Sequence, residues 1–341
     1  MPNLDIISYQ EAYGCHPSRV CASRWQPSPL KLRIANMFIA PGFEQRSIVT
    51  DLGAIAYAAP QPEFWPVADH PDQTLLFLHG FGGGSSSYEW SKVYPAFASD
   101  YRVFAPDLIG WGQSDHPERS YQISDYETTI VQLLQKLAPQ GAIVIASALT
   151  AAIMVRVAVQ QPELVKGLIL VTPAGLSDFG KDFSESWLPQ ILRVPLLDKV
   201  LYQSAIATSA GISGFLSNRQ FANPDLITGE MVEAYLASAT QPNAEYAALS
   251  FVRGDLCFDL AEWLPQLTVP TVVFWGQAAQ FTDVELGKRL AALNPEAIQQ
   301  FEIIENVGLT PQLEQPSLTI ALIQRSLRQL LAIPDPATSA H

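Results

Sequence analysis

The chain has 341 residues, of which 48% are hydrophobic, so it can bury the core of one large domain and carry an insertion. Its formal net charge of −13 argues against a nucleic-acid-binding protein, because a surface that neutralises phosphates must be basic. No apolar run reaches the roughly 18 residues of a transmembrane helix, and the N-terminus lacks the charged-then-apolar order of a signal peptide.

Cysteine usage, together with these exclusions, favours a cytoplasmic protein. The three cysteines, Cys15, Cys21 and Cys257, are too few for a disulfide framework, and a reducing compartment is the default. Cys15, His16 and Cys21 lie close together in the sequence but are one ligand short of a structural zinc site. We therefore expect neither a metal nor a cofactor.

The first 45 residues differ in composition from the rest of the chain. They are rich in proline and carry a basic group in an acidic protein, formed by Arg19, Arg24, Lys31 and Arg33. We predict an N-terminal arm over residues 1–45 that packs on the surface of the domain. The alternative is a docking segment for a partner protein or for an anionic membrane surface, where each basic residue adds about 1 kcal/mol.

Strand and helix patterns follow the arm. Ser47–Ala58 predicts a strand pair, and the apolar segment Thr74–Leu78 predicts a strand that is covered on both faces. The glycine-rich turn His79–Gly84 lacks the Gly-Lys-Ser/Thr ending of a P-loop, so we expect its N–H groups to face a pocket rather than a nucleotide. The next predicted elements are a helix near Trp90–Ala98, a strand Tyr101–Ala105, a helix Asp125–Leu137 and a strand Val165–Pro173.

The segment Gly141–Gln161 has the layout of a nucleophile elbow. It consists of an apolar strand Ala142–Ala146, a turn of small residues at Ser147-Ala148-Leu149, and a helical pattern Thr150–Gln161. In such an elbow a strained turn raises one side chain above the end of a parallel sheet. The usual pattern is Gly-x-Ser-x-Gly, and the nucleophile position is occupied here by Ala148, which has no group that can attack a substrate.

The chain resembles the α/β-hydrolase superfamily in the order and spacing of four motifs. These are His79-Gly80 after a strand, Asp107-x-x-Gly110-x-Gly112-x-Ser114 after the next strand, the elbow, and the strand Val165–Pro173. The resemblance covers roughly Arg46–Leu331 and implies an α/β fold, with a mostly parallel sheet, helices on both faces and a helical cap. It divides the chain into an arm (1–45), a core (46–175 and 263–333), a cap (176–262) and a tail (334–341). For the second part of the core we predict strands Thr271–Trp275 and Gln300–Ile304, and helices Val284–Leu293 and Ser317–Leu331.

The resemblance also locates the other two catalytic positions of the family. The acid normally follows a Trp-Gly strand end, and Ala279 occupies that position after Trp275-Gly276. The histidine belongs to the pattern Gly-His-x-x-x-x-Glu-x-Pro, and the matching segment Gly308–Pro316 carries Leu309 there. Replacing the whole triad by Ala148, Ala279 and Leu309 is physically coherent, because a buried polar group left without its partners costs about 1–3 kcal/mol.

Three other residues are candidates to replace the triad. His116 lies on the loop after the Asp107 motif, and Ser147 precedes the apex of the elbow, where we expect its side chain to point away from the pocket. Asp283 is the acid nearest to Ala279, but the spacing of Thr282 and Glu285 predicts a capping box at a helix start. For His79 we expect a structural role in its turn.

Two functions are consistent with these residues. The first is a hydrolase-like protein without hydrolase activity that binds a small apolar ligand or a partner protein. The second is an atypical enzyme that acts on an ester or another carbonyl compound. The resemblance implies that the N–H groups of Phe81 and Leu149 form an oxyanion-hole-like pair, so we expect the pocket to bind an acyl, carotenoid-like or terpenoid carbonyl compound.

The residues expected to line the pocket come from the core and from the cap. The core candidates are His79, Gly80, Ser147, Ala148 and Leu309. The roof candidates in the cap are Trp187, Leu188, Pro189, Ile191, Leu192, Leu196, Leu197, Tyr202 and Phe215.

Overall fold

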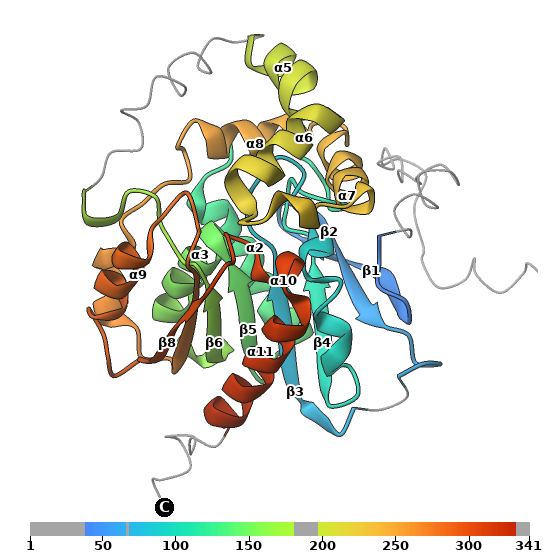
Figure 1. Ribbon diagram of the computed structural model, residues 1–341. Helices are drawn as coiled ribbons and strands as arrows, with labels where there is room; N and C mark the ends of the chain where they lie inside the picture. Colours follow the sequence, from blue (N-terminus) through green and yellow to red (C-terminus); the bar gives the residue numbers. More distant parts are fainter. Residues whose placement is uncertain (1–37, 66–67, 181–196, 332–341) are drawn as a thin grey trace, which may run out of the picture.

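A single eight-stranded sheet forms the centre of the protein (Figure 1). The computed structural model describes residues 38–65, 68–180 and 197–331. The strand order is β1-β2-β4-β3-β5-β6-β7-β8; β1 pairs antiparallel with β2 and β2 with β4, whereas all other neighbours are parallel. The strands are β1 (Phe43–Thr50), β2 (Gly53–Pro60), β3 (His70–Leu78), β4 (Tyr101–Pro106), β5 (Ala142–Ser147), β6 (Val165–Val171), β7 (Thr271–Gly276) and β8 (Ile298–Ile304). The predicted mostly parallel α/β sheet is confirmed.

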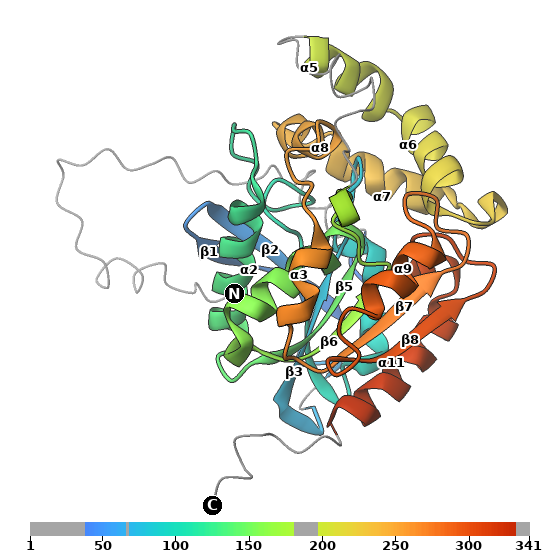
Figure 2. The ribbon, with the colours of Figure 1, turned by 90° about the vertical axis from the view of Figure 1, so that its left-hand side faces the viewer.

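Helices cover both faces of the sheet, as the apolar parallel strands require. Along β3, Leu76 and Leu78 pack toward one face, while Leu75 and Phe77 pack toward the other, because neighbouring side chains of a strand point in opposite directions. The first face is covered by α2 (Ile123–Leu137), α3 (Ala148–Gln160) and α9 (Val284–Ala291). The second is covered by α11 (Pro316–Leu331) and the short helices η1 (Ser87–Trp90) and η2 (Tyr94–Phe97), and Figure 2 shows α2 and α3 on the side opposite α11.

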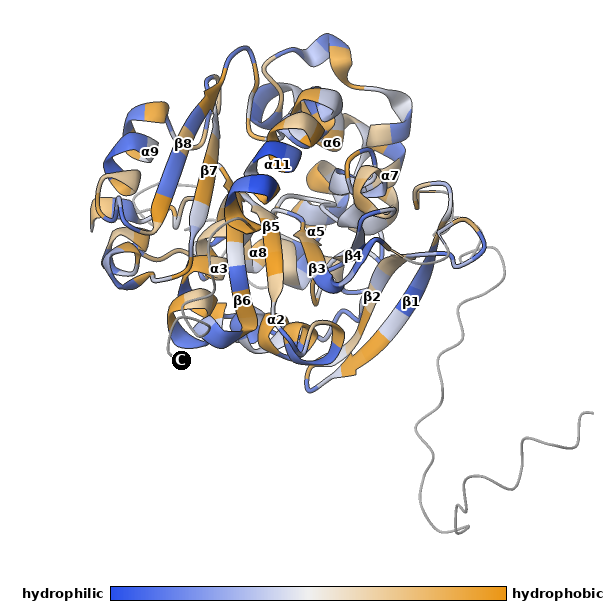
Figure 3. Cartoon of the chain, turned by 90° about the horizontal axis from the view of Figure 1, so that it is seen from below, coloured by the Kyte–Doolittle hydropathy of each residue, from blue (hydrophilic) through white to orange (hydrophobic). Residues whose placement is uncertain are grey.

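Hydrophobic residues concentrate between these layers. Seen from below, strands such as β5 and β7 are mostly hydrophobic, whereas α11 presents hydrophilic residues outward (Figure 3). Within the described ranges, none of the helices combines the length and the apolarity needed to cross a bilayer. The arm and tail predictions concern residues that lie mostly outside the described ranges, so they stay predictions.

Helices of the region 197–252 lie across the carboxyl ends of the parallel strands, at the top of Figure 1. They are α5 (Leu197–Leu201), α6 (Ser209–Phe215), α7 (Gly229–Ala239) and α8 (Ala244–Val252). Their position fits the predicted cap, which stays a prediction as a separate unit. The predicted roof residues Trp187, Leu188, Pro189, Ile191, Leu192 and Leu196 lie outside the described residues.

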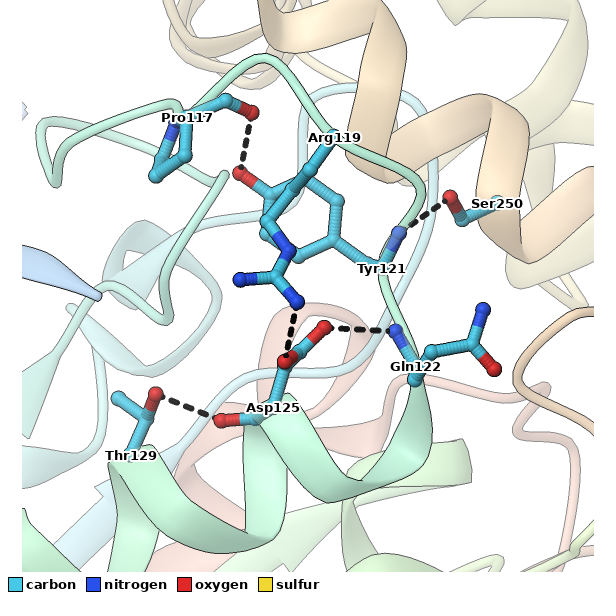
Figure 4. A network of polar contacts seen from close by, with 7 residues as sticks. All are labelled: Pro117, Arg119, Tyr121, Gln122, Asp125, Thr129 and Ser250. Atoms are coloured by element: carbon cyan, nitrogen blue, oxygen red, sulfur yellow. Dashed lines mark hydrogen bonds and ion pairs between the residues drawn. The ribbon is translucent and has the colours of Figure 1, made fainter. Parts of the chain in front are cut away.

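A polar network joins α8 to the core at the start of α2 (Figure 4). The backbone N–H of Tyr121 donates to Ser250 Oγ of α8 at 2.9 Å, and the Tyr121 hydroxyl donates to Pro117 O at 3.1 Å. Asp125 accepts from Gln122 N at 2.9 Å, which closes the first turn of α2, and it pairs with Arg119 at 2.9 Å. These contacts fix the loop before α2 against α8.

Two local predictions differ from the structure. The helix expected near Trp90–Ala98 is replaced by the short helices η1 and η2; Pro95 lies in the first turn of η2 and has no N–H to continue a helix from η1. The capping box expected at Thr282 is wrong. Asp283 is the N-cap of α9 and its side chain accepts from Leu286 N at 2.7 Å, which leaves the Thr282 hydroxyl free of that role.

Candidate functional site

The turn between β5 and α3 has the geometry of an elbow. Ala148 follows the strand directly, begins the helix and has a φ of 52°, in the left-handed region. A residue other than glycine in a sparsely populated backbone region costs about 1–3 kcal/mol and persists where the surrounding structure imposes it. The turn at Gly80 packs closely against the elbow, because a Cβ on Gly80 would lie 3.3 Å from the Ala148 Cβ.

A narrow, largely apolar pocket includes Ala148 in its wall. The structure therefore brings together Ala148, Leu149, Phe81 and Leu309, which come from three separate loops. Helix α8 contributes Phe251, which the sequence did not single out because it belongs to a generally apolar helix. The lining residues are Phe81, Ala148, Leu149, Thr172, Ala174, Leu176, Phe251, Phe281, Thr282 and Leu309.

Several predicted pocket residues do not line this pocket. Ala279 is absent from its wall, because the turn after β7 folds back on itself: Ala279 N donates to Gly276 O at 3.1 Å and Ala278 N donates to Val307 O at 2.9 Å. Phe281 and Thr282 of the same loop line the pocket instead. Of the described roof candidates, Tyr202 is buried and donates to Ala239 O at 2.9 Å, whereas Phe215 flanks the pocket, with its ring 6.4 Å from that of Phe281.

His79, Gly80 and Ser147 lie behind the pocket wall rather than in it. His79 is fully buried; Leu108 N donates to its Nε2 at 2.9 Å, so Nδ1 carries the proton and donates to Gly80 O at 2.7 Å. In a trans peptide the C=O and N–H point in opposite directions, so this bond directs the Phe81 N–H away from His79. The structural role expected for His79 is therefore to fix the Gly80–Phe81 peptide plane.

Two backbone donors are available at the pocket. Within the described ranges, the N–H groups of Phe81 and Leu149 have no hydrogen-bond partner, although both residues are buried. Leu149 lies in the first turn of α3, where the N–H groups lack partners in the helix and the helix dipole favours negative charge. The pocket can therefore stabilise a carbonyl oxygen or another acceptor.

Sequence analysis missed Glu89, a buried acid close to this wall. It is 1% exposed; its Oε2 accepts from Gly80 N at 3.0 Å and its Oε1 accepts from the Tyr235 hydroxyl at 3.1 Å. The Tyr235 hydroxyl also lies 3.1 Å from Gln220 Oε1, so a chain of contacts joins the Gly80 turn to α7 and the segment before it. A single acid in a serine-rich loop resembles a surface residue, and only the fold shows that it is enclosed.

The segment that carries Leu309 is hydrogen-bonded to the chain between α6 and α7. Leu309 N donates to Gln220 O at 2.7 Å. Glu314 is 7% exposed and accepts from Gly308 N at 2.7 Å with Oε1 and from Ala222 N at 2.7 Å with Oε2. Burial raises the pKa of Glu314, against the effect of these N–H donors. Glu314 thus joins the loop of Leu309 to the chain between α6 and α7.

None of the three candidate replacement residues lines the pocket. His116 Nε2 lies 3.2 Å from Gly112 O, Ser147 is 1% exposed, and Asp283 caps α9. Because Ser147 ends β5 with its side chain behind the wall, it has no access to a ligand in this pocket. In the described part of the chain, no group of three or more His, Cys, Asp or Glu side chains is placed to hold a metal ion.

The lowered pKa of His116 predicts that the stability of the protein depends on pH. Burial lowers its pKa below the usual 6.5, against the effects of the Gly112 carbonyl and of Asp107, Asp115 and Glu245. Below pH 6.5 the unfolded chain therefore binds more protons than the folded protein, so the free energy of unfolding falls as pH falls through this region and recovers as pH rises. Urea unfolding between about pH 5 and pH 8 measures this slope. His116→Gln should reduce the slope, and an unchanged slope would exclude His116 as its source.

The sheet order, the elbow and the pocket at the carboxyl ends of the strands define an α/β-hydrolase-type fold. A model of the α/β hydrolase fold family matches residues 73–316, so the chain belongs to this family.

Relatives in this family include hydrolases. An uncharacterized hydrolase of Bacillus subtilis, YugF, is 26% identical over 253 residues, which cover 72% of this chain and 86% of the relative. Human epoxide hydrolase 4 is 26% identical over 274 residues, covering 75% and 72% of the two chains. Among solved structures, carboxylesterase CesB from Bacillus subtilis matches with a TM-score of 0.67 and 18% identity over 87% of this chain and 96% of that chain, which supports the fold.

Proposed function

We propose that this member of the α/β-hydrolase family is a binding protein without a standard catalytic triad, and that its ligand is a small, largely apolar molecule with one hydrogen-bond acceptor. The observation that carries the proposal is the pocket wall. The wall has Ala148 at the elbow apex and Leu309 at the family's histidine position. It also has the N–H groups of Phe81 and Leu149, which have no partner in the described ranges.

The residues of the pocket wall favour ligand binding over cleavage of a bond in the ligand. Neither a histidine nor a carboxylate belongs to its described lining, so a general base within hydrogen-bond reach of a ligand is lacking there. The two N–H donors still require an acceptor, because buried N–H groups seldom stay unpaired.

Native mass spectrometry of the gently purified protein, followed by organic extraction, tests this function. We expect a small apolar carbonyl compound to be released. A variant with a filled pocket, Phe251→Trp, should release less of it, since Phe251 lines the wall from α8. Absence of any ligand, together with no binding from a panel of lipids and small carbonyl metabolites, would favour a scaffold for a partner protein instead.

Restoring the nucleophile alone should not restore hydrolysis. We expect Ala148→Ser to show no measurable gain in ester turnover, because a serine hydroxyl without an adjacent base is a weak nucleophile. Hydrolysis of an activated ester by the variant and by the parent protein gives the comparison. Turnover by Ala148→Ser at ordinary enzymatic rates would reveal a base that the pocket wall does not show.

A second candidate function is an atypical hydrolase that acts on a carbonyl substrate. The named hydrolases among the relatives and the two free N–H donors favour it, because such donors also stabilise the oxyanion of acyl transfer. Direct measurement of ester hydrolysis by the purified protein separates the two candidates.

A further inference from the structure

An open groove lies where β2 and β4 separate, at the end of the sheet opposite the ligand pocket. The ladder between these strands includes Tyr57 and Ala58 of β2, so within the described chain Tyr101–Phe104 of β4 have no strand partner on that side. These four residues line the groove together with Ala59 and Pro60 of β2. An uncovered strand edge can pair with another chain, and proteins usually cover it.

The groove is rich in aromatic and proline side chains. They are Pro60, Pro62, Trp65, Pro71, Tyr101 and Phe104. Aromatic grooves bind proline-rich segments, because such segments are already extended in the polyproline II conformation and lose little entropy on binding. The shape and composition of this groove therefore suit a short proline-containing segment.

The groove also carries positive charge. Among its described lining residues, the charged side chains are Arg46 and Arg102, and both are exposed. Arg46 pairs with Glu44 at 2.7 Å. Arg102 has no carboxylate partner in the described chain, and one of its nitrogens donates to Leu137 O at 3.2 Å. The remaining N–H groups of Arg102 are suited to bind a carboxylate.

Helix α11 ends near this groove. Figures 1 and 2 both show its last turn near the start of β3, where Pro71 lines the groove. Burial raises the pKa of Tyr101, as does Asp100, whereas Arg328 of α11 acts in the opposite direction, so the end of α11 is electrostatically coupled to this groove residue.

The residues that follow α11 have the composition that the groove suits. Residues 332–336 read Ala-Ile-Pro-Asp-Pro, which places one carboxylate between two prolines. An extended segment advances about 3 Å per residue, so these residues span about 15 Å from the end of the helix. Their charge is opposite to that of the groove.

We propose that the segment Pro334-Asp335-Pro336 docks in this groove of its own chain, with its prolines against the aromatic side chains and the Asp335 carboxylate paired with Arg102. The docked segment covers the β2-side edge of β4. The N-terminal arm fits the groove less well, because its basic group would be repelled by Arg46 and Arg102.

Photo-cross-linking of the full chain tests this docking. Benzoyl-phenylalanine takes the place of Ile333, and mass spectrometry of the digested protein locates the cross-links. We expect them within one chain, at residues 59–65 and 101–104. Arg102→Glu should lower their yield about fivefold, and Asp335→Lys in the same chain should restore it, because the pair is then rebuilt with the charges exchanged.

Lys166→Glu is the matched control. Lys166 is exposed near the start of β6, at the same end of the sheet, but it is absent from the described lining of the groove, so its reversal should leave the yield unchanged. Equal losses in Arg102→Glu and Lys166→Glu, or no recovery with Asp335→Lys, overturn the pairing with Arg102. If Arg102→Glu does not fold, Arg102→Gln replaces it.

The cross-linked positions decide the docking itself. Cross-links to another face of the chain, or none at all, overturn it. Cross-links between two chains also overturn docking within one chain and make a second copy the source of the segment. Deleting residues 332–341 gives a second readout, since amide hydrogen exchange at residues 101–104 should then become faster, and unchanged exchange there contradicts the docking.

Discussion

The purified protein should hydrolyse an activated ester about 10⁶-fold more slowly than a hydrolase with a complete triad. Removing a triad lowers turnover by about this factor, and the roughly 10³–10⁴-fold acceleration over water that survives comes from the oxyanion hole and binding. The Phe81 and Leu149 N–H groups are the donors available for that residual effect. Release of a nitrophenolate from a short-chain ester, followed in parallel with a triad-containing esterase, measures the difference.

A contaminating esterase is the main source of error in that measurement. Phe251→Trp provides the control, because the larger ring fills the pocket from α8 while leaving the elbow unchanged. Activity that is equal in the parent protein and in this variant does not come from the pocket. Turnover at ordinary enzymatic rates that Phe251→Trp abolishes would contradict the proposal and establish the second candidate, an atypical hydrolase.

Removal of Glu314 should cause the largest loss of stability among the substitutions considered. We expect Glu314→Ala to lower the free energy of unfolding by about 3 kcal/mol, since each buried donor left without a partner costs about 1–3 kcal/mol. The donors concerned are the N–H groups of Gly308 and Ala222, which lose their acceptor together. Chemical denaturation measures the loss, and ligand affinity should fall with it, because Leu309 lies in the loop that Glu314 holds.

A nearby acid provides the matched control for Glu314. Glu305 lies on the same connection after β8 but is exposed, so Glu305→Ala should change the free energy of unfolding by less than about 0.5 kcal/mol. Glu314→Gln should fall between the two, because its amide can accept on one side but presents N–H groups on the other. Similar losses for Glu314→Ala and Glu305→Ala would show that the hydrogen bonds of Glu314 to Gly308 N and Ala222 N contribute nothing to stability.

The sequence by itself determined the elements of the core and their order. The apolar run at β3 predicted a strand covered on both faces, and the segments of β5, β6 and β7 predicted further strands. The small residues around Ala148 predicted a sharp strand-to-helix turn. These features are local: an apolar run of strand length and a turn of small residues constrain the backbone whatever lies around them. The order of the motifs then indicated the family, and with it the mostly parallel sheet.

The fold changes and extends the set of pocket residues that the family motifs indicated. Ala279 and Thr282 lie on one loop, and the sequence favoured the first as a pocket residue and the second as a helix cap. In the fold Ala279 is absent from the pocket wall, because the turn after β7 is hydrogen-bonded back to Gly276 and Val307. Thr282 lines the wall instead, and Asp283 is the residue that caps α9. The burial of Glu89 and the position of Phe251 in the pocket wall are likewise results of tertiary packing. Both depend on segments that are far apart in the sequence and pack together. Local sequence patterns carry no information about such contacts, so the places of Phe251, Phe281 and Thr282 in the wall follow only from the folded chain.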